Sequence, residues 1–189
     1  MRNNLYRLVY RDIKQQNIGF DIRGDVKVFD FGLCKSLEDK DKAKGYGYRI
    51  TPYTGTVPYM APEIAKLRPY DQAADVFSFA ILLWEILALR PAFRRMTLQD
   101  YLIRVCSNNE RPRIHRSWPK VLRTTLAGAW NVDPLKRPSM YRLASLLLGC
   151  LQSMTDDIQV LSRAEDRSSK SNNKSARFYK QSKSSMSAG

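Results

Sequence analysis

Two aspartates near the start of the chain are placed so that they could act on one substrate. Asp12 lies in the segment YRDIKQQN at 10–17, and Asp30 opens the segment DFG at 30–32. Between them, two short apolar runs flank the turn-like sequence DIRGD, in which Gly24 supplies the flexible position. This pattern predicts a β-hairpin, and a hairpin brings its two ends together. Both carboxylates can therefore face the same small volume.

Such a pair of carboxylates suits the transfer of a phosphoryl group. One carboxylate accepts the proton of the attacking hydroxyl, and the other holds Mg²⁺, which bridges the phosphates and offsets their charge. Asn17 adds a neutral oxygen ligand for a second metal ion, and Lys14 adds a cation beside the transferred group. These residue types therefore predict Mg²⁺-dependent phosphoryl transfer.

With a third segment, APE at 61–63, these motifs stand in a fixed order, and the sequence resembles the protein kinase superfamily over residues 5–152. The ordered set is far more specific than DFG alone, which any turn could contain. The resemblance implies an α+β, protein-kinase-like fold, represented by its mainly helical C-terminal lobe with a short hairpin. It also implies that ATP is the phosphoryl donor and that proteins are the substrates.

The resemblance gives each residue around the catalytic loop (10–17) a role. Asp12 is implied to be the catalytic base, and Lys14 to stabilise the γ-phosphoryl group of ATP. Asn17 and Asp30 are implied to be the Mg²⁺ ligands, so that they bind Mg·ATP together with Lys14. The hydroxyl of Thr56 is implied to contact both Asp12 and Lys14.

Three further residues are implied to hold the lobe together. Glu63 of the APE segment should pair with Arg137 of the KRP segment. Breaking a buried ion pair of this kind costs about 3–5 kcal/mol. Asp75 should brace the backbone of the catalytic loop from a buried helix. The activation segment then covers 30–63.

Arg11, directly before Asp12, is implied to regulate activity. In the family this pairing often marks control by phosphorylation of the activation segment, because an arginine can clamp the phosphate. The candidate acceptors are Thr51, Tyr53 and Thr54.

The kind of acceptor hydroxyl follows from two positions. Lys14 lies two residues after Asp12, where serine/threonine kinases have lysine, whereas tyrosine kinases usually have AAR there. Thr56 in GTVPYMAPE also fits the serine/threonine pattern, and DVFSFAILLWEIL at 75–87 resembles the tyrosine-kinase-like group. The resemblance therefore implies a protein serine/threonine kinase.

Hydrophobic patterns predict mostly helices in the second half of the chain. A helix is expected over 76–87, with apolar side chains on every face, as in a helix buried all round. Thr97 and Asp100 form a capping-box pair, and two further helices follow, the first at 119–130. Before them, 38–57 has no period and is expected to be a long loop.

The kinase domain is expected to comprise residues 1–157 and to be incomplete. No glycine-rich loop and no VAIK-type lysine precede the catalytic loop, so the N-terminal lobe that covers ATP in the family is missing from the sequence. We therefore expect this chain to be inactive in isolation. The alternative is a non-catalytic scaffold or decoy that binds protein partners through the lobe.

The charge of the chain suggests anionic partners. The formal net charge is +14, which suits acidic substrates or phosphates. A nucleic-acid binder is a further alternative, but no run of Lys and Arg alternates with aromatic residues, and we expect no specific nucleic acid. Residues 158–189 are rich in Ser and Lys and are expected to be a disordered basic tail.

The cysteines and the hydropathy pattern indicate the cellular compartment in which the protein is expected. Three widely spaced cysteines, one histidine and no CxxC pair disfavour a zinc site or a disulfide framework. The first residues lack an apolar signal region, and no apolar run is long enough to span a bilayer. We expect a cytoplasmic protein in a reducing compartment.

Overall fold

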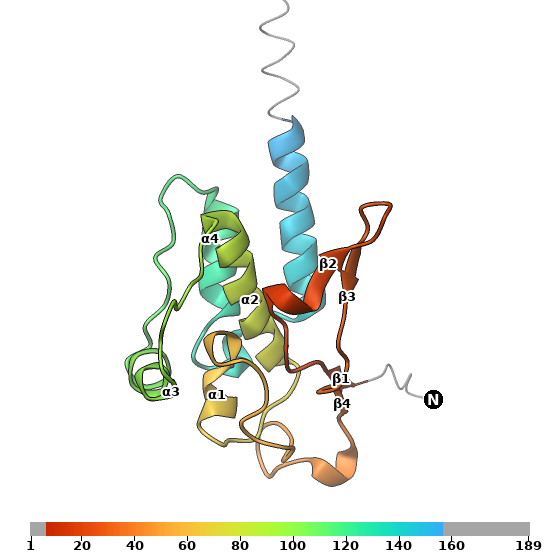
Figure 1. Cartoon of the computed structure of the whole chain (residues 1–189), viewed down its shortest axis with the longest axis vertical. Helices are drawn as coiled ribbons and strands as arrows, with labels where there is room; N and C mark the ends of the chain where they lie inside the picture. Colours follow the sequence, from red (N-terminus) through yellow and green to blue (C-terminus); the bar gives the residue numbers. More distant parts are fainter. Residues whose placement is uncertain (1–6, 157–189) are drawn as a thin grey trace, which may run out of the picture. The chain divides into compact units, whose positions relative to one another are not determined.

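The computed structural model describes residues 7–156, in which short strands are followed by helices (Figure 1). Two antiparallel sheets of two strands come first: β1 (Leu8–Val9) pairs with β4 (Lys35–Ser36), and β2 (Ile18–Phe20) pairs with β3 (Val26–Val28). The helices are α1 (Pro62–Ala65), α2 (Ala73–Ala88), α3 (Leu98–Asp100), which continues as a π-helical stretch (Tyr101–Ser107), and α4 (Lys120–Ala129). Single 3₁₀ turns lie at Gln15–Asn17, Asp39–Asp41, Val57–Tyr59 and Pro134–Lys136.

Residues up to Leu146 form one compact unit, which contains every element named above. A further helix begins at residue 140 and continues to 156, and its residues from Leu147 onward belong to a second unit. No described helix is long and apolar enough to cross a membrane. The tail predicted at 158–189 lies outside the described residues.

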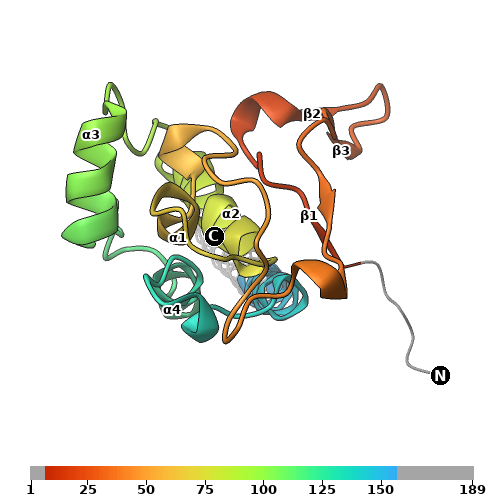
Figure 2. The ribbon, with the colours of Figure 1, turned by 90° about the horizontal axis from the view of Figure 1, so that it is seen from below.

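Helix α2 forms the centre of the first unit (Figure 2). Val76, Phe77 and Ile81 are at most 2% exposed, and the helix contacts α4 and the turn at Val57–Tyr59. Because apolar side chains leave the helix in several directions, it can be covered on several sides at once. The expected burial on every face fails only toward the C-terminal end, where Ile86 is 59% exposed.

Capping contacts define where the helices begin and end. The Asp71 carboxylate accepts a hydrogen bond of 2.8 Å from the N–H of Ala73, at the start of α2, and Leu89 ends this helix with a left-handed φ of 52°. The predicted capping box at α3 is confirmed, because Thr97 and Asp100 each accept from the other's backbone N–H. The helix predicted at 119–130 corresponds to α4.

The predicted hairpin is also confirmed, and its geometry positions the candidate site. In the register of β2 and β3, Ile18 lies opposite Val28, and Gly24 in the turn has a φ of 83°. The pairing continues one step beyond the strands, where the N–H of Phe29 donates to the carbonyl of Asn17 at 2.8 Å. The catalytic loop and the DFG segment therefore run side by side.

The first unit is thus α+β, with a short hairpin and mainly helices, as predicted. The segment predicted as a long loop contains one 3₁₀ turn and is otherwise irregular. It is tied down by isolated bridges from Tyr48 to Lys42 and to Tyr70. These bridges hold the activation segment close to the start of α2 instead of leaving it free.

Candidate active site

The backbone of the catalytic loop is held by a carboxylate from α2. Asp75 accepts the N–H of Tyr10 at 2.7 Å with one oxygen and the N–H of Arg11 at 2.9 Å with the other. Burial raises the pKa of the Asp75 carboxyl, and the two N–H groups partly oppose that shift. Arg11 has a φ of 71°, which is costly for a residue with a side chain, so the paired bonds stabilise a strained conformation directly before Asp12.

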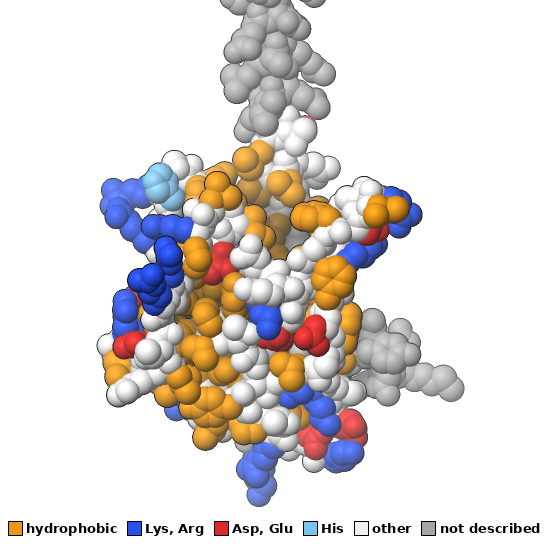
Figure 3. All heavy atoms as spheres, in the orientation of Figure 1, with side chains coloured by type: hydrophobic (Ala, Val, Ile, Leu, Met, Phe, Trp, Pro, Cys, Tyr) orange, Lys and Arg blue, Asp and Glu red, His pale blue; other side chains and the backbone are white. Residues whose placement is uncertain are grey.

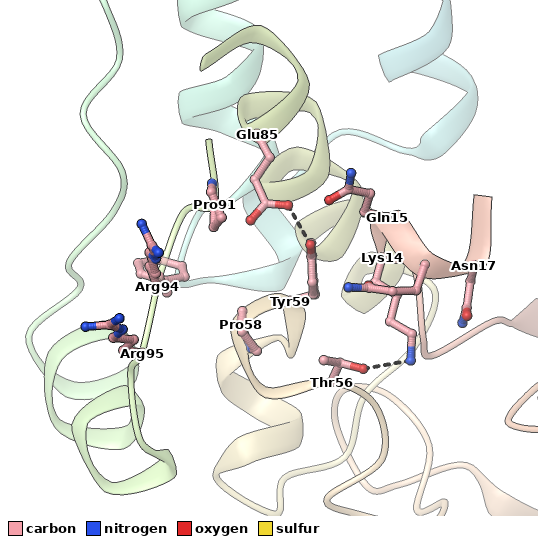
Figure 4. A pocket seen from close by; sticks show the side chains of 12 residues that line it. Lys14, Gln15, Asn17, Thr56, Pro58, Tyr59, Glu85, Pro91, Arg94 and Arg95 are labelled. Carbon is pink, nitrogen blue, oxygen red and sulfur yellow. Dashed lines mark hydrogen bonds between the residues drawn. The ribbon is translucent and has the colours of Figure 1, made fainter. Parts of the chain in front are cut away.

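The carboxylate of Asp12 is the centre of the site. It is 6% exposed, and Lys14 Nζ lies 2.6 Å from its Oδ2. Asn17 Nδ2 lies 2.9 Å from the same oxygen, while Thr56 Oγ1 donates to Oδ1 at 2.7 Å. Lys14 also donates to Thr56 at 3.0 Å (Figure 4). These bonds fix the direction of the Asp12 carboxylate and join the catalytic loop to the activation segment.

The exposed side chain of Asp30 lies directly after the hairpin. The residue before it, Phe29, is tied to the catalytic loop on both sides, since its N–H bonds to Asn17 and its carbonyl accepts from the hydroxyl of Tyr10. Asp30 has a φ of 53°, and its Oδ1 accepts from the N–H of Gly32 at 3.1 Å. The hairpin therefore positions a second carboxylate, that of Asp30, next to the catalytic loop.

The structure brings four of the five residues predicted to carry the chemistry into direct contact, namely Asp12, Lys14, Asn17 and Thr56. Asp30 stands apart from this network among the described hydrogen bonds and is connected to it through the backbone of the hairpin. A buried carboxylate beside a lysine and a hydroxyl, with an exposed carboxylate nearby, can orient an attacking hydroxyl next to a bound anion.

Gly55 allows the activation segment to approach the catalytic loop closely. Its φ is 109°, and a Cβ at this position would lie 2.4 Å from the carbonyl oxygen of Arg11. Only glycine fits both the backbone conformation and the space. This close approach places the neighbouring residue, Thr56, against Asp12. The motif GTVPYMAPE contains this signal, but the sequence alone does not reveal the contact with Arg11.

A pocket of about 420 Å³ opens beside Lys14 and Thr56 (Figure 4). On its inner side the hydroxyl of Tyr59 donates to Glu85 at 2.5 Å. Burial, followed by the charge and hydrogen bond of Glu85, raises the pKa of the Tyr59 hydroxyl, which keeps it protonated as a donor. The pocket therefore has a wall that is fixed by a hydrogen bond next to Lys14 and Thr56.

Comparison with known protein families agrees with this geometry. Residues 5–147, which include the catalytic loop, the hairpin and the activation segment, match the protein kinase domain. The chain belongs to the protein kinase family.

Kinases from distant organisms share this region. The chain is 36% identical to the dual specificity protein kinase shkC of Dictyostelium discoideum, over 74% of this chain and 27% of that protein. It is 32% identical to the serine/threonine-protein kinase STY17 of Arabidopsis thaliana, over 79% of this chain and 25% of that protein. It is 29% identical to mitogen-activated protein kinase kinase kinase 12 of Rattus norvegicus, over 74% of this chain and 15% of that protein. The chain thus spans about a quarter or less of the length of these kinases.

In this kinase chain a buried ion pair connects the end of the activation segment to the last part of the first unit. Arg137 reaches both carboxylate oxygens of Glu63, at 2.6 and 2.8 Å, and its side chain is fully buried. The same guanidinium donates to the carbonyls of Ala73 and Asn131 at 2.9 and 2.8 Å. One side chain therefore joins α1, the start of α2 and the segment after α4.

Arg11, directly before Asp12, contacts the segment that was predicted to be the activation segment. The guanidinium of Arg11 donates to the carbonyl of Leu33 and, at 3.3 Å, to the hydroxyl of Tyr70. Tyr70 in turn donates to the carbonyl of Thr51 at 2.7 Å. Of the predicted acceptors, Thr51 and Tyr53 are exposed; Thr54 is buried and its hydroxyl donates to Thr51 at 3.0 Å.

Several residues that line the pocket could not be recognised from the sequence. Glu85, Arg94 and Arg95 line the pocket beside Lys14, although they come from the end of α2 and the loop after it. Their positions depend on how α2 lies against the catalytic loop, which spacing along the chain does not encode. Only the capping box after Arg95 marks where that loop ends.

Proposed function

We propose that this chain is the C-terminal lobe of a protein serine/threonine kinase, which transfers the γ-phosphoryl group of ATP to serine or threonine hydroxyls of proteins. The observation that carries the proposal is the network around Asp12, in which Lys14, Asn17 and Thr56 converge on one buried carboxylate beside a pocket. Free cysteines and the use of ATP suit a cytoplasmic location.

Asp12 orients the substrate hydroxyl and accepts its proton. Thr56 and Asn17 keep the carboxylate in position, while Lys14, 2.6 Å from Asp12, presents a positive charge on the side where the phosphoryl group passes. Since phosphoryl transfer depends mainly on positioning and electrostatic stabilisation, this arrangement supplies the part of catalysis that the protein can supply near the acceptor.

The residues at the hairpin fit Mg²⁺. Asn17 donates both hydrogen bonds of its amide nitrogen to Asp12, which leaves its oxygen as a ligand, and Asp30 offers an exposed carboxylate. Mg²⁺ is usually held by one or two protein oxygens together with phosphate oxygens and water. Asn17 and Asp30 would hold the ion, and Mg²⁺ when bound offsets the charge of the phosphates.

The same proposal divides the chain into functional parts. Residues 1–157 belong to the kinase domain, with 30–63 as the activation segment, and 158–189 form a basic tail. Support comes from the kinase match at 5–147 and from the contacts of 30–63 with the catalytic loop.

Regulation through Arg11 is a second part of the proposal. The carbonyl of Thr51 accepts from the Tyr70 hydroxyl, which also accepts from Arg11, so phosphorylation of Thr51 would place a dianion near both side chains. We expect Thr51→Val to lower the activity of the protein purified from its cells about tenfold. Thr54→Val is the matched control, because that hydroxyl is buried. Equal activity of Thr51→Val and the unaltered protein would refute this role.

Protein immunopurified from its own cells tests the main proposal. After incubation with Mg·ATP and a mixture of proteins, mass spectrometry should find new phosphate on serine and threonine, and EDTA should prevent it. Phosphate on tyrosine alone would contradict the acceptor class. No phosphate transfer at all would contradict the function.

Exposed apolar side chains favour one alternative, a non-catalytic scaffold. Phe20 is 73% exposed, Ile22 104%, Val26 62% and Phe31 61%, all on the hairpin and the DFG segment. An apolar face of this kind is usually covered by another protein surface or segment. If the immunopurified protein retains a partner through this face and transfers no phosphate, the scaffold replaces the kinase as the proposed function.

A further inference from the structure

Two arginines line the pocket beside the proposed acceptor site. Arg94 and Arg95 come from the loop after α2, and Figure 4 shows them across the pocket from Lys14 and Thr56. Both arginine side chains are exposed. A protein segment that presents a hydroxyl to Asp12 must place its neighbouring residues in or near this pocket. The two arginines are therefore positioned to contact the substrate on one side of the acceptor residue.

The loop that carries the two arginines is anchored at several points. Glu85 accepts the backbone N–H of Ala92 at 2.8 Å, and Phe93 is 6% exposed and packs edge-to-face on Tyr101 at 5.8 Å. Arg95 has a φ of 60°, an uncommon conformation for a residue with a side chain. Because the backbone is anchored at Ala92 and Phe93, directly before the two arginines, less conformational entropy is lost when the guanidinium groups bind a ligand.

The pocket carries an excess of positive charge. Glu85 is its only acidic lining residue, and both of its oxygens are engaged, one by Ala92 and the other by the hydroxyl of Tyr59. Within residues 7–156, neither Arg94 nor Arg95 takes part in an ion pair. On the face shown in Figure 3, Lys and Arg side chains gather along the edge next to α3. An anion entering this pocket would find two guanidinium groups that form no ion pair within residues 7–156, while the Glu85 carboxylate in the wall is already hydrogen-bonded to Tyr59 and Ala92.

We propose that this pocket selects substrates with an anionic side chain, a carboxylate or a phosphate, close to the acceptor hydroxyl, and that Arg94 and Arg95 bind it. The proposal rests on the proposed kinase function, because the acceptor hydroxyl at Asp12 defines where the anion lies. Guanidinium groups match both carboxylate and phosphate with paired hydrogen bonds, and a substrate with a basic residue at the same place is repelled.

Peptides with one serine test this selectivity in the immunopurified protein. At the residues flanking the serine, four versions carry Asp, phosphoserine, Ala or Arg. We expect kcat/KM to be about tenfold higher for the Asp or phosphoserine peptide than for the Ala peptide, and lower still for the Arg peptide. The larger of the two anionic effects identifies carboxylate or phosphate as the natural group.

Two double variants distinguish an effect of the pocket from an effect of the protein's overall positive charge. Arg94→Ala/Arg95→Ala should lower kcat/KM for the anionic peptides about tenfold and remove the ranking of the four peptides. Arg113→Ala/Arg116→Ala removes the same charge from exposed positions outside the pocket and should preserve the ranking. An equal loss of ranking in both variants, or no ranking in the unaltered protein, overturns the proposal.

A binding measurement with peptides that cannot be phosphorylated tests this proposal independently of the kinase function. The same peptides with alanine in place of the acceptor serine are labelled, and fluorescence anisotropy measures their affinity. Preferential binding of anionic peptides that depends on Arg94 and Arg95 supports the pocket even if no peptide is phosphorylated, a result that would overturn the kinase function alone. Equal binding of anionic and neutral peptides overturns the pocket and leaves the kinase function standing.

Discussion

Replacing Asp12 with Asn should reduce the phosphoryl-transfer rate of the protein by about 10³-fold, within the usual range for removal of a general base. The substitution keeps the shape of the side chain but removes the negative charge that pairs with Lys14 and replaces one of the two accepting oxygens with an NH₂ group. An amide at this position cannot take the proton of the acceptor hydroxyl. The measurement is kcat with Mg·ATP and a serine peptide, using immunopurified wild-type and Asp12→Asn protein side by side.

Asp39→Asn is the matched control for this experiment. It makes the same chemical change at a carboxylate that is 87% exposed and that, within residues 7–156, forms an ion pair only with the exposed Arg7. We expect its kcat to stay within a factor of about two, because exposed pairs contribute little. A rate for Asp12→Asn within tenfold of wild type would show that Asp12 is not the base. Thermal unfolding of each variant distinguishes lost chemistry from lost fold.

Much of the catalytic loop could be predicted from the sequence, because local patterns determine it. The turn with Gly24 and the alternating short runs specify the hairpin, and the hairpin alone brings Asn17 beside the residue before Asp30. The capping box at Thr97 is equally local. In such cases the interacting groups belong to one capping motif or to one hairpin, so spacing along the chain carries the information.

The pocket could not be predicted in the same way. Glu85 contacts the Tyr59 hydroxyl only because the activation segment packs against α2. Arg95 lines the pocket from a left-handed backbone conformation, which a non-glycine residue does not predict. The strands β1 and β4 were not predicted either, since each has two residues and they are far apart in the chain. Contacts that depend on packing between distant segments leave no periodic trace.

Replacing Arg137 with Met should lower the free energy of unfolding of the full chain by about 3–5 kcal/mol. The substitution leaves the carboxylate of Glu63 buried, at 6% exposure, without its partner, and it also removes donors to the carbonyls of Ala73 and Asn131. An uncompensated buried charge is costly because it has lost its water. Urea denaturation of the 189-residue chain, followed by circular dichroism, measures the change.

The pair Arg104–Glu110 provides a control with the same geometry on the surface. Its two bonds are 2.8 and 2.7 Å long, but the side chains are 51% and 42% exposed. We expect Arg104→Met to cost less than about 1 kcal/mol, because water solvates the remaining carboxylate.

The double variant Glu63→Gln/Arg137→Met should lose less stability than Arg137→Met alone, since no unpaired charge remains buried. If Arg137→Met were no more costly than Arg104→Met, burial would not be the source of the stabilisation. If the double variant were as unstable as Arg137→Met, the bonds to Ala73 and Asn131 would be the main contribution. Arg137 bonds both to Glu63 in α1 and to the carbonyl of Ala73 at the start of α2, so the two variants together measure how much this connection contributes to stability.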